Sequence, residues 1–214
     1  MNYYRKTVGF LASSRIGRVM MLGIVAMLAY SLLADAANQR RGAKVKSIVV
    51  ESAVPTLTVG NAYQGGIIAY IDETGQHGLI AATDDQGEAK WSNVTTTEIG
   101  TTAQGTAIGT GASNTTAIIN QTGHNASAAK VCADYSVDVD GTTYDDWYLP
   151  SKDELNQLYH NLYKEGVGGF GADRYWSSSE YNAKYAWYQV FGNGNQDYNY
   201  KFYTFSRVRP VRAF

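Results

Sequence analysis

Cysteine is almost absent from this sequence: Cys132 is the only one in 214 residues. A single thiol cannot form an intramolecular disulfide, and it excludes a cysteine metal cluster and a CxxC redox site. In the context AAKVCADY, Cys132 is expected on the buried face of a helix, where it behaves as a small apolar side chain. Chemistry that depends on paired cysteines is therefore excluded.

Charged residues are also scarce, at 17% of the chain, and they are unevenly distributed. Residues 1–46 hold eight Lys or Arg and one acidic residue, whereas residues 47–214 hold ten Lys or Arg and eighteen Asp or Glu. An acidic domain is a poor electrostatic match for nucleic acid or heparin-like polyanions, so no nucleic-acid partner is expected. The 44% hydrophobic content and the 22 glycines favour a loop-rich globular domain.

An uncharged hydrophobic run occupies residues 19–33 and is preceded by basic residues. The following Ala34-Asp35-Ala36 has the pattern of a cleavage site, which predicts a signal peptide over residues 1–37. An uncleaved N-terminal membrane anchor is the alternative, because basic residues also follow the run. Under both interpretations the domain is exported, as a secreted or a cell-surface protein. Membrane contact is expected only through this N-terminal segment.

A polar, basic linker is predicted over residues 38–58, where Pro55 argues against a central strand. The domain itself is predicted over residues 59–214. It begins with a β-hairpin whose strands cover residues 63–71 and 77–82, joined by a turn. His77, at the start of the returning strand, is expected to be a structural hydrogen-bonding residue.

The middle of the domain is expected to contain more loop than regular structure. Residues 83–113 are rich in Gly, Thr, Asp and Ser, which predicts a long irregular loop around a buried Trp91. Two short helices are predicted over residues 114–120 and 127–135. Ser151 and Glu154 form a capping-box pattern, which predicts the start of a third helix.

Residues 138–146 form the most acidic stretch of the chain. A calcium loop is one interpretation, but the spacing lacks the ligands of an EF-hand. Asp140-Gly141 is a tight-turn pair, which favours a solvated hairpin.

No catalytic or metal site is expected. His77, His124 and His160 lack metal-ligand spacing, and Ser177, Ser178 and Ser179 lack the G-x-S-x-G elbow of a hydrolase. These serines are expected to bond backbone groups beside a buried Trp176. We therefore expect neither enzymatic activity nor a cofactor.

The C-terminal stretch, residues 175–214, interleaves two kinds of residue. Those expected to be buried are Trp176, Trp187, Val190, Phe191, Val208, Val211 and Phe214. Between them lie tyrosine and amide residues, which recognition surfaces use for rigid contact area and adaptable hydrogen bonds. The predicted ligand-binding residues are Tyr181, Asn182, Lys184, Tyr185, Asn193, Asn195, Asp197, Tyr198, Asn199, Tyr200 and Tyr203.

Several motifs occur in a fixed order: YDDWYLPSKDEL at 144–155, YWSSSE at 175–180 and RVRPVR at 207–212. With YQGGI at 63–67 and GQHGLIA at 75–81, they resemble the domain family named after the C-terminal domain of the Legionella collagen-like adhesin. The resemblance spans about residues 59–214. No Gly-X-Y stalk is present, and the acidic charge disfavours the sulfated polysaccharides that the adhesin binds.

This resemblance implies an α+β, C-type-lectin-like fold. Two main helices, twisted antiparallel strands, long loops and paired N- and C-terminal strands are expected. Domains of this general fold also serve as variable proteins of diversity-generating retroelements, in which adenine-directed mutagenesis rewrites C-terminal codons. The Asn, Tyr and Asp residues at 181–203 are compatible with such a surface.

Two functions remain open for this domain. The first is an exported adhesin- or receptor-like module that binds a glycan or a protein surface through residues 181–203. The alternative is a structural or assembly module of an envelope, filament or virion surface. The ligand and the oligomeric state are left open.

Overall fold

The computed structural model describes residues 56–214, which belong to a single compact unit beginning at Pro55. The predicted signal peptide or anchor and nearly all of the predicted linker lie outside the described residues. Among residues 56–214, no helix has both the length and the apolar character that a membrane crossing requires.

The first sheet joins the two ends of the domain. Its strand order is β1-β2-β3-β11, all antiparallel. The strands are β1 (Ala62–Tyr63), β2 (Gly66–Ile71), β3 (Gly78–Ala82) and β11 (Val211–Ala213). The predicted hairpin is confirmed as β2 and β3, and the last strand pairs with β3 rather than with β1.

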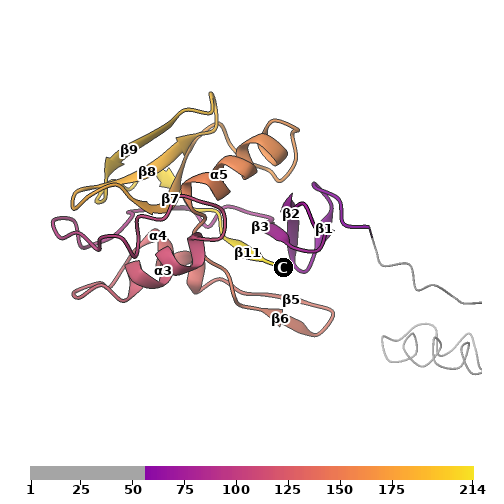
Figure 1. The fold of residues 1–214 in the computed structure, drawn as a ribbon, viewed down its shortest axis with the longest axis horizontal. Coiled ribbons are helices and arrows are strands. Elements are labelled where there is room, and N and C mark those ends of the chain that lie inside the picture. The colour runs from indigo at the N-terminus through magenta and orange to yellow at the C-terminus, as the bar shows by residue number, and fades with distance from the viewer. Residues whose placement is uncertain (1–55) are drawn as a thin grey trace, which may run out of the picture. The chain divides into compact units, whose positions relative to one another are not determined.

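The second sheet carries the C-terminal stretch and has the order β4-β10-β7-β8-β9. Its strands are β4 (Glu88–Ala89), β10 (Ser206–Arg207), β7 (Arg174–Glu180), β8 (Tyr185–Val190) and β9 (Gln196–Tyr200). β10 pairs with β7 in parallel, and the other pairs are antiparallel. β9 is therefore an edge strand at the end of a long hairpin (Figure 1).

Three α-helices lie in the described part of the chain, one more than the two main helices that the resemblance implies. They are α3 (Gly111–Ile119), α4 (Ala128–Ala133) and α5 (Lys152–Leu158), and α5 continues into a π-helical turn, η1 (Tyr159–Tyr163). The predicted capping box is confirmed, because the Ser151 side chain accepts from the Glu154 amide and the Glu154 carboxylate accepts from the Ser151 amide. The boundaries predicted for α3 and α4 differ from the observed ones by one to three residues.

The acidic stretch forms the predicted hairpin, with β5 (Val137–Val139) paired to β6 (Thr142–Tyr144). Asp140 and Gly141 at its turn have φ values of 49° and 84°. Two successive positive φ values are typical of a tight hairpin turn, and Asp and Gly tolerate them. Within residues 56–214, no group of three or more His, Cys, Asp or Glu is placed to hold a metal ion.

Helices cover both faces of the second sheet (Figure 1). Tyr175 packs with α5 and η1, whereas its neighbour Trp176 packs with α3 and α4, because successive side chains of a strand point to opposite faces. Trp91 is fully buried, as predicted, and donates from its indole nitrogen to the Ser177 carbonyl at 2.8 Å. This anchor fixes the irregular segment between β4 and α3.

Three residues expected in the core are only partly buried: Trp187, Val190 and Phe214. The reason is clearest for Trp187, which lies on the α5 side of β8 beyond the end of the helix. Lys152, the first residue of α5, places its ammonium 3.8 Å from the Trp187 ring centroid. Much of this end of the hairpin is thus left for solvent or for a ligand.

Candidate functional site

A cluster of aromatic rings in contact with one another covers one face of the β8–β9 hairpin. The register places Tyr185 opposite Tyr200 and Trp187 opposite Tyr198, so these four side chains share a face. Tyr181, just before the hairpin, stacks on Tyr198 with ring centroids 4.1 Å apart and an interplanar angle of 2°. Tyr185 contacts Tyr200 at 4.6 Å and Tyr198 at 5.5 Å. We call these five residues the aromatic patch.

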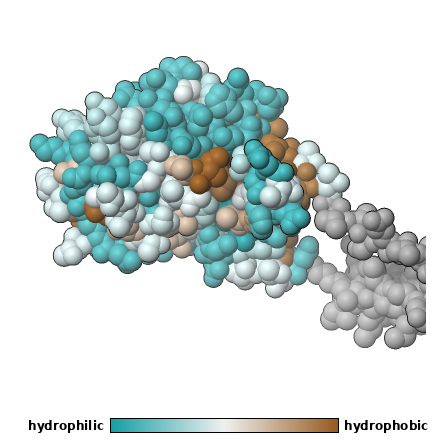
Figure 2. Space-filling model, viewed as in Figure 1, coloured by the Kyte–Doolittle hydropathy of each residue, from teal (hydrophilic) through white to brown (hydrophobic). Residues whose placement is uncertain are grey.

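The rings of the aromatic patch are fixed by one another and yet remain accessible. Tyr181, Tyr198 and Tyr200 each keep 41–42% of their surface exposed, which is high for large side chains with several ring contacts. In the hydropathy colouring of Figure 2, brown patches on the visible face are small and most of it is teal or white. Rigid, half-exposed tyrosines supply contact area at a low entropy cost on binding.

Further aromatic residues continue from the patch into the segment after β9. Phe202 stacks on Tyr200 at 5.0 Å, and Tyr203 and Phe205 follow. Phe202 is 55% exposed and Phe205 is 64% exposed. The sequence prediction included Tyr203 but missed Phe202, Phe205 and Trp187. The signal for Phe202 was the alternation of aromatic residues at 198, 200 and 202, which places them on one side of an extended chain.

Two polar residues of β9, Asp197 and Asn199, face away from the aromatic patch. Asp197 pairs with Tyr188, and Asn199 pairs with Ala186, on the opposite face of the hairpin. The Asp197 carboxylate accepts from the Tyr198 amide, and the Asn199 side chain accepts from the Tyr200 amide, both at 2.8 Å. Both predicted site residues therefore have a structural role.

These two hydrogen bonds close the exposed edge of the sheet. Val190 donates to the Asn195 carbonyl and Lys201 donates to the Lys184 carbonyl, so in the same register Asp197 and Asn199 bond to β8. The amides of Tyr198 and Tyr200 consequently point outward, toward solvent. Capping these amides within the strand blocks the pairing of β9 with a further strand.

The other predicted site residues occupy turns. The Asn182 side chain accepts from the backbone amides of Lys184 and Tyr185, which shapes the turn before β8. The Asn193 side chain accepts from the Asn195 amide at the opposite end of the hairpin. Asn195, at that end, is five residues from Tyr200, which is roughly 16 Å at about 3.3 Å per residue. The structure therefore brings the predicted tyrosines together but leaves Asn193 and Asn195 apart from them.

A buried ion pair lies directly beneath the aromatic patch. The Lys201 ammonium is 2.5 Å from the Glu180 carboxylate, and both side chains have no exposed surface. Glu180 also accepts from the amides of Ile99 and Gly100, at 2.9–3.0 Å. Because Glu180 precedes Tyr181 and Lys201 follows Tyr200, this pair fixes the backbone on both sides of the patch.

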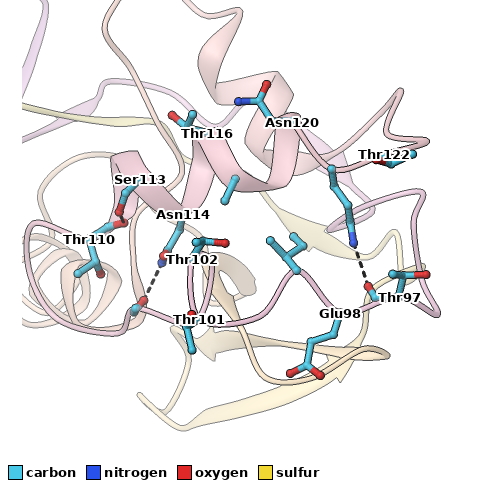
Figure 3. A pocket seen from close by; sticks show the side chains of 14 residues that line it. Thr97, Glu98, Thr101, Thr102, Thr110, Ser113, Asn114, Thr116, Asn120 and Thr122 are labelled. Atoms are coloured by element: carbon cyan, nitrogen blue, oxygen red, sulfur yellow. Dashed lines mark hydrogen bonds between the residues drawn. The ribbon is translucent and has the colours of Figure 1, made fainter.

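A groove lies between α3 and the segment 97–105, in a part of the chain for which no site was predicted (Figure 3). It encloses about 1030 Å³. Thr101 and Thr102 line it from the segment, and Thr116 and Asn120 line it from α3. Glu98 is its only ionisable lining residue.

The arginines of the last segments are held in ion pairs. Arg209 is fully buried and bonds to Asp85 at 2.7 Å, and Arg207 bonds to the same carboxylate at 3.0 Å. Arg212 bonds to Asp146 at 2.5 Å. Arg209 and Arg212 therefore lie near the core, Arg207 stays partly exposed, and the ion pairs leave little positive charge for binding a polyanion.

Cys132, two serines of β7 and His124 occupy structural positions. His77 is exposed and its imidazole forms no hydrogen bond within residues 56–214, unlike the structural hydrogen-bonding role predicted for it. Cys132 is fully buried, and this burial raises the pKa of its thiol well above the ordinary value. Ser177 donates to the Trp187 carbonyl and Ser179 to the Gly105 carbonyl, as expected of serines that bond backbone groups. His124 contacts the Ser127 hydroxyl at 2.8 Å, and burial lowers the pKa of His124.

The fold and this site define a mixed helix-and-strand, sheet-rich domain with an exposed aromatic face. The family of the Lcl C-terminal domain, that of the Legionella collagen-like protein, matches residues 80–212. The chain belongs to this family, which confirms the resemblance seen in its motifs.

A fimbrial protein from Bacteroides ovatus ATCC 8483 has a similar fold, with a TM-score of 0.51 and 14% sequence identity. The similarity covers 72% of this chain and 48% of that one, so this chain spans about half of the fimbrial protein. No curated protein shows significant similarity to the chain.

Proposed function

We propose that residues 59–214 form an exported, C-type-lectin-like recognition domain of an adhesin or receptor, and that the aromatic patch binds a surface glycan. The observation that carries this proposal is the set of five aromatic rings in contact with one another, one pair stacked and the others tilted or edge-to-face, with three of the rings more than 40% exposed. Exposed aromatic side chains of this kind mark binding sites rather than folding requirements.

The chemistry of the patch favours a glycan. A tyrosine ring offers an apolar face to the C–H face of a sugar, and its hydroxyl bonds the sugar's hydroxyl groups. Recognition by strand addition, a common way of binding an extended peptide, needs a free strand edge. Asp197 and Asn199 cap two outward amides of that edge, which disfavours strand addition and favours binding through side chains.

Export follows in this proposal from the hydrophobic run at residues 19–33, as a signal peptide or an anchor. The residue types at 181–203 also match the products of adenine-directed mutagenesis by a retroelement. Sequencing the 3′ end of the gene across a population tests that part: substitutions confined to adenine positions support it, and their absence contradicts it.

The test of glycan binding is a mixed glycan array probed with residues 56–214 and with the variant Tyr198→Ala/Tyr200→Ala. Interface tyrosines often contribute about 2 kcal/mol, so the variant should lose at least about tenfold in affinity. The matched control, Asn193→Ala/Asn195→Ala, changes the far end of the same hairpin and should bind like the wild type. Equal binding by the tyrosine variant would refute the proposal.

An assembly role is the second candidate, and one observation favours it. Phe202 and Phe205 are more than half exposed and have no polar group to bond a glycan. Such residues suit contact with another protein copy. Sedimentation of the wild type and of Phe202→Ser/Phe205→Ser distinguishes the two: assembly through this segment predicts concentration-dependent oligomers that the variant does not form.

A further inference from the structure

We infer that the groove between α3 and the segment 97–105 is a second binding site, distinct from the aromatic patch, for a neutral oligosaccharide. Its volume of about 1030 Å³ is at the upper end of ligand sites, which commonly enclose about 300–1,000 Å³. That size accommodates several sugar units rather than a single small metabolite.

The residues that line the groove match the chemical character of a sugar, which combines uncharged polar groups with apolar faces. Of its fourteen lining residues, seven carry hydroxyl groups and three carry amides, whereas Glu98 alone is ionisable. Hydroxyl and amide groups both donate and accept, as the hydroxyl groups of a sugar do. Ile99, Ala117 and the threonine methyl groups add apolar surface for the C–H faces of the rings. An anionic ligand finds no lysine or arginine in this lining.

Polar groups in the groove are free to bind. Within residues 56–214, the side chains of Thr101, Thr102, Asn120 and Thr122 form no hydrogen bond with the protein, and all four residues are exposed. Figure 3 shows Thr101 and Thr102 on the segment and Asn120 on α3, on the two sides of the groove. A ligand lying between them can bond to both sides.

The irregular wall of the groove is held in place by buried side chains. Glu180 binds the amides of Ile99 and Gly100, and Asn114 donates to the Gly105 carbonyl at 2.6 Å. Gln121 donates from α3's side to the Thr97 carbonyl at 2.9 Å. A wall fixed before binding loses little conformational entropy when the ligand binds.

The same anchor, Glu180, links the groove to the aromatic patch. One of its carboxylate oxygens bonds to Lys201, between patch residue Tyr200 and Phe202, and both oxygens hold the groove wall. The Glu180 carboxylate therefore holds the backbone at both sites, but the residues that line the two sites are different. Substitutions at their surfaces can consequently be made independently.

The experiment titrates residues 56–214 with cellohexaose, maltohexaose, mannohexaose and chitohexaose, with sulfated and sialylated glycans for comparison. Thr116→Trp fills the groove, and Ala112→Trp adds the same ring at an exposed position of α3 that does not line it. We expect at least one neutral hexaose to bind, with a loss of at least tenfold in Thr116→Trp and none in Ala112→Trp.

Comparison with Tyr198→Ala/Tyr200→Ala separates this site from the aromatic patch. Neutral-hexaose binding that survives in the tyrosine variant but fails in Thr116→Trp supports the groove, whatever the patch binds. Binding that Thr116→Trp leaves unchanged, binding restricted to the anionic glycans, or no binding of any hexaose by the folded wild type would overturn the inference. Circular dichroism and thermal melting of each variant establish that it is folded.

Discussion

Removing the charge of Lys201 should destabilise the whole domain, because its partner Glu180 would remain buried and charged. The pair has no exposed surface, and Lys201 also lies 4.9 Å from the Trp91 ring centroid. Lys201→Met keeps the length of the side chain and removes only the ammonium. The fold around Glu180 is thereby left with a carboxylate and two backbone donors, from Ile99 and Gly100.

The expected loss is large. Breaking a buried ion pair by removing one partner costs about 3–5 kcal/mol of unfolding free energy. For a domain of this size, each kcal/mol lowers the melting temperature by about 2–4 °C, which gives a fall of roughly 6–20 °C. The control Lys130→Met removes the lysine of an exposed pair with Asp134, which should cost only about 0.3–0.5 kcal/mol.

Urea unfolding followed by tryptophan fluorescence measures both variants. The double variant Glu180→Leu/Lys201→Met should remain less stable than the wild type, because the amides of Ile99 and Gly100 lose their acceptor, at about 1–3 kcal/mol for each unpaired group. A loss below about 1 kcal/mol in Lys201→Met would refute the reasoning, as would equal effects of Lys201→Met and Lys130→Met.

Three further outcomes are expected. Asp197→Ala/Asn199→Ala should produce concentration-dependent association in light scattering, because it frees two outward amides of an edge strand; a monomer at all concentrations would contradict this role. Cys132 should react with Ellman's reagent only as fast as the domain unfolds, since burial raises the pKa of its thiol, and rapid labelling in native buffer would contradict its burial. Burial raises the pKa of Glu154 above its ordinary 4.5, so the folded state binds this proton more tightly, and stability declines as pH rises from 4.5 through the folded pKa. In urea unfolding, the stability of Glu154→Gln relative to the wild type should therefore be greater at pH 7 than at pH 4. An equal difference between the two proteins at both pH values would refute the assignment.

Local signals in the sequence predicted several elements of this fold well. The capping box of α5, the β2–β3 hairpin and the Asp140-Gly141 turn each depend on residues only a few positions apart. The physical determinants of these elements are therefore present in short stretches of sequence.

The contacts that shape the two sites could not be predicted in this way. Glu180 meets Lys201 and the amides of Ile99 and Gly100, and Arg209 meets Asp85, across 21 to 124 positions of sequence. Nothing in the local pattern distinguishes these partners from other acidic and basic residues. The groove escaped prediction for the same reason, because its wall has no regular secondary structure and takes its shape from such distant anchors.

The sequence prediction treated residues 181–203 as one binding surface, and the structure divides that surface. Strand pairing separates its tyrosines from Asp197 and Asn199, and the length of the hairpin separates them from Asn193 and Asn195. The pairing register and the position of α5 decide which residues are exposed together. Neither can be derived from residue types alone.

The capped amides of β9 allow the aromatic side chains on this strand to be replaced without loss of the fold. The strand pairs with β8 on one side, and Asp197 and Asn199 cap the outward amides of Tyr198 and Tyr200 on the other, so folding makes few demands on the side chains of Tyr198 and Tyr200. These positions can accept new residues while the framework stays intact, provided that the capping residues Asp197 and Asn199 are kept. A library randomised at 198 and 200 alone should thus yield mostly folded domains with altered specificity, which makes this hairpin a natural scaffold for engineering new binders.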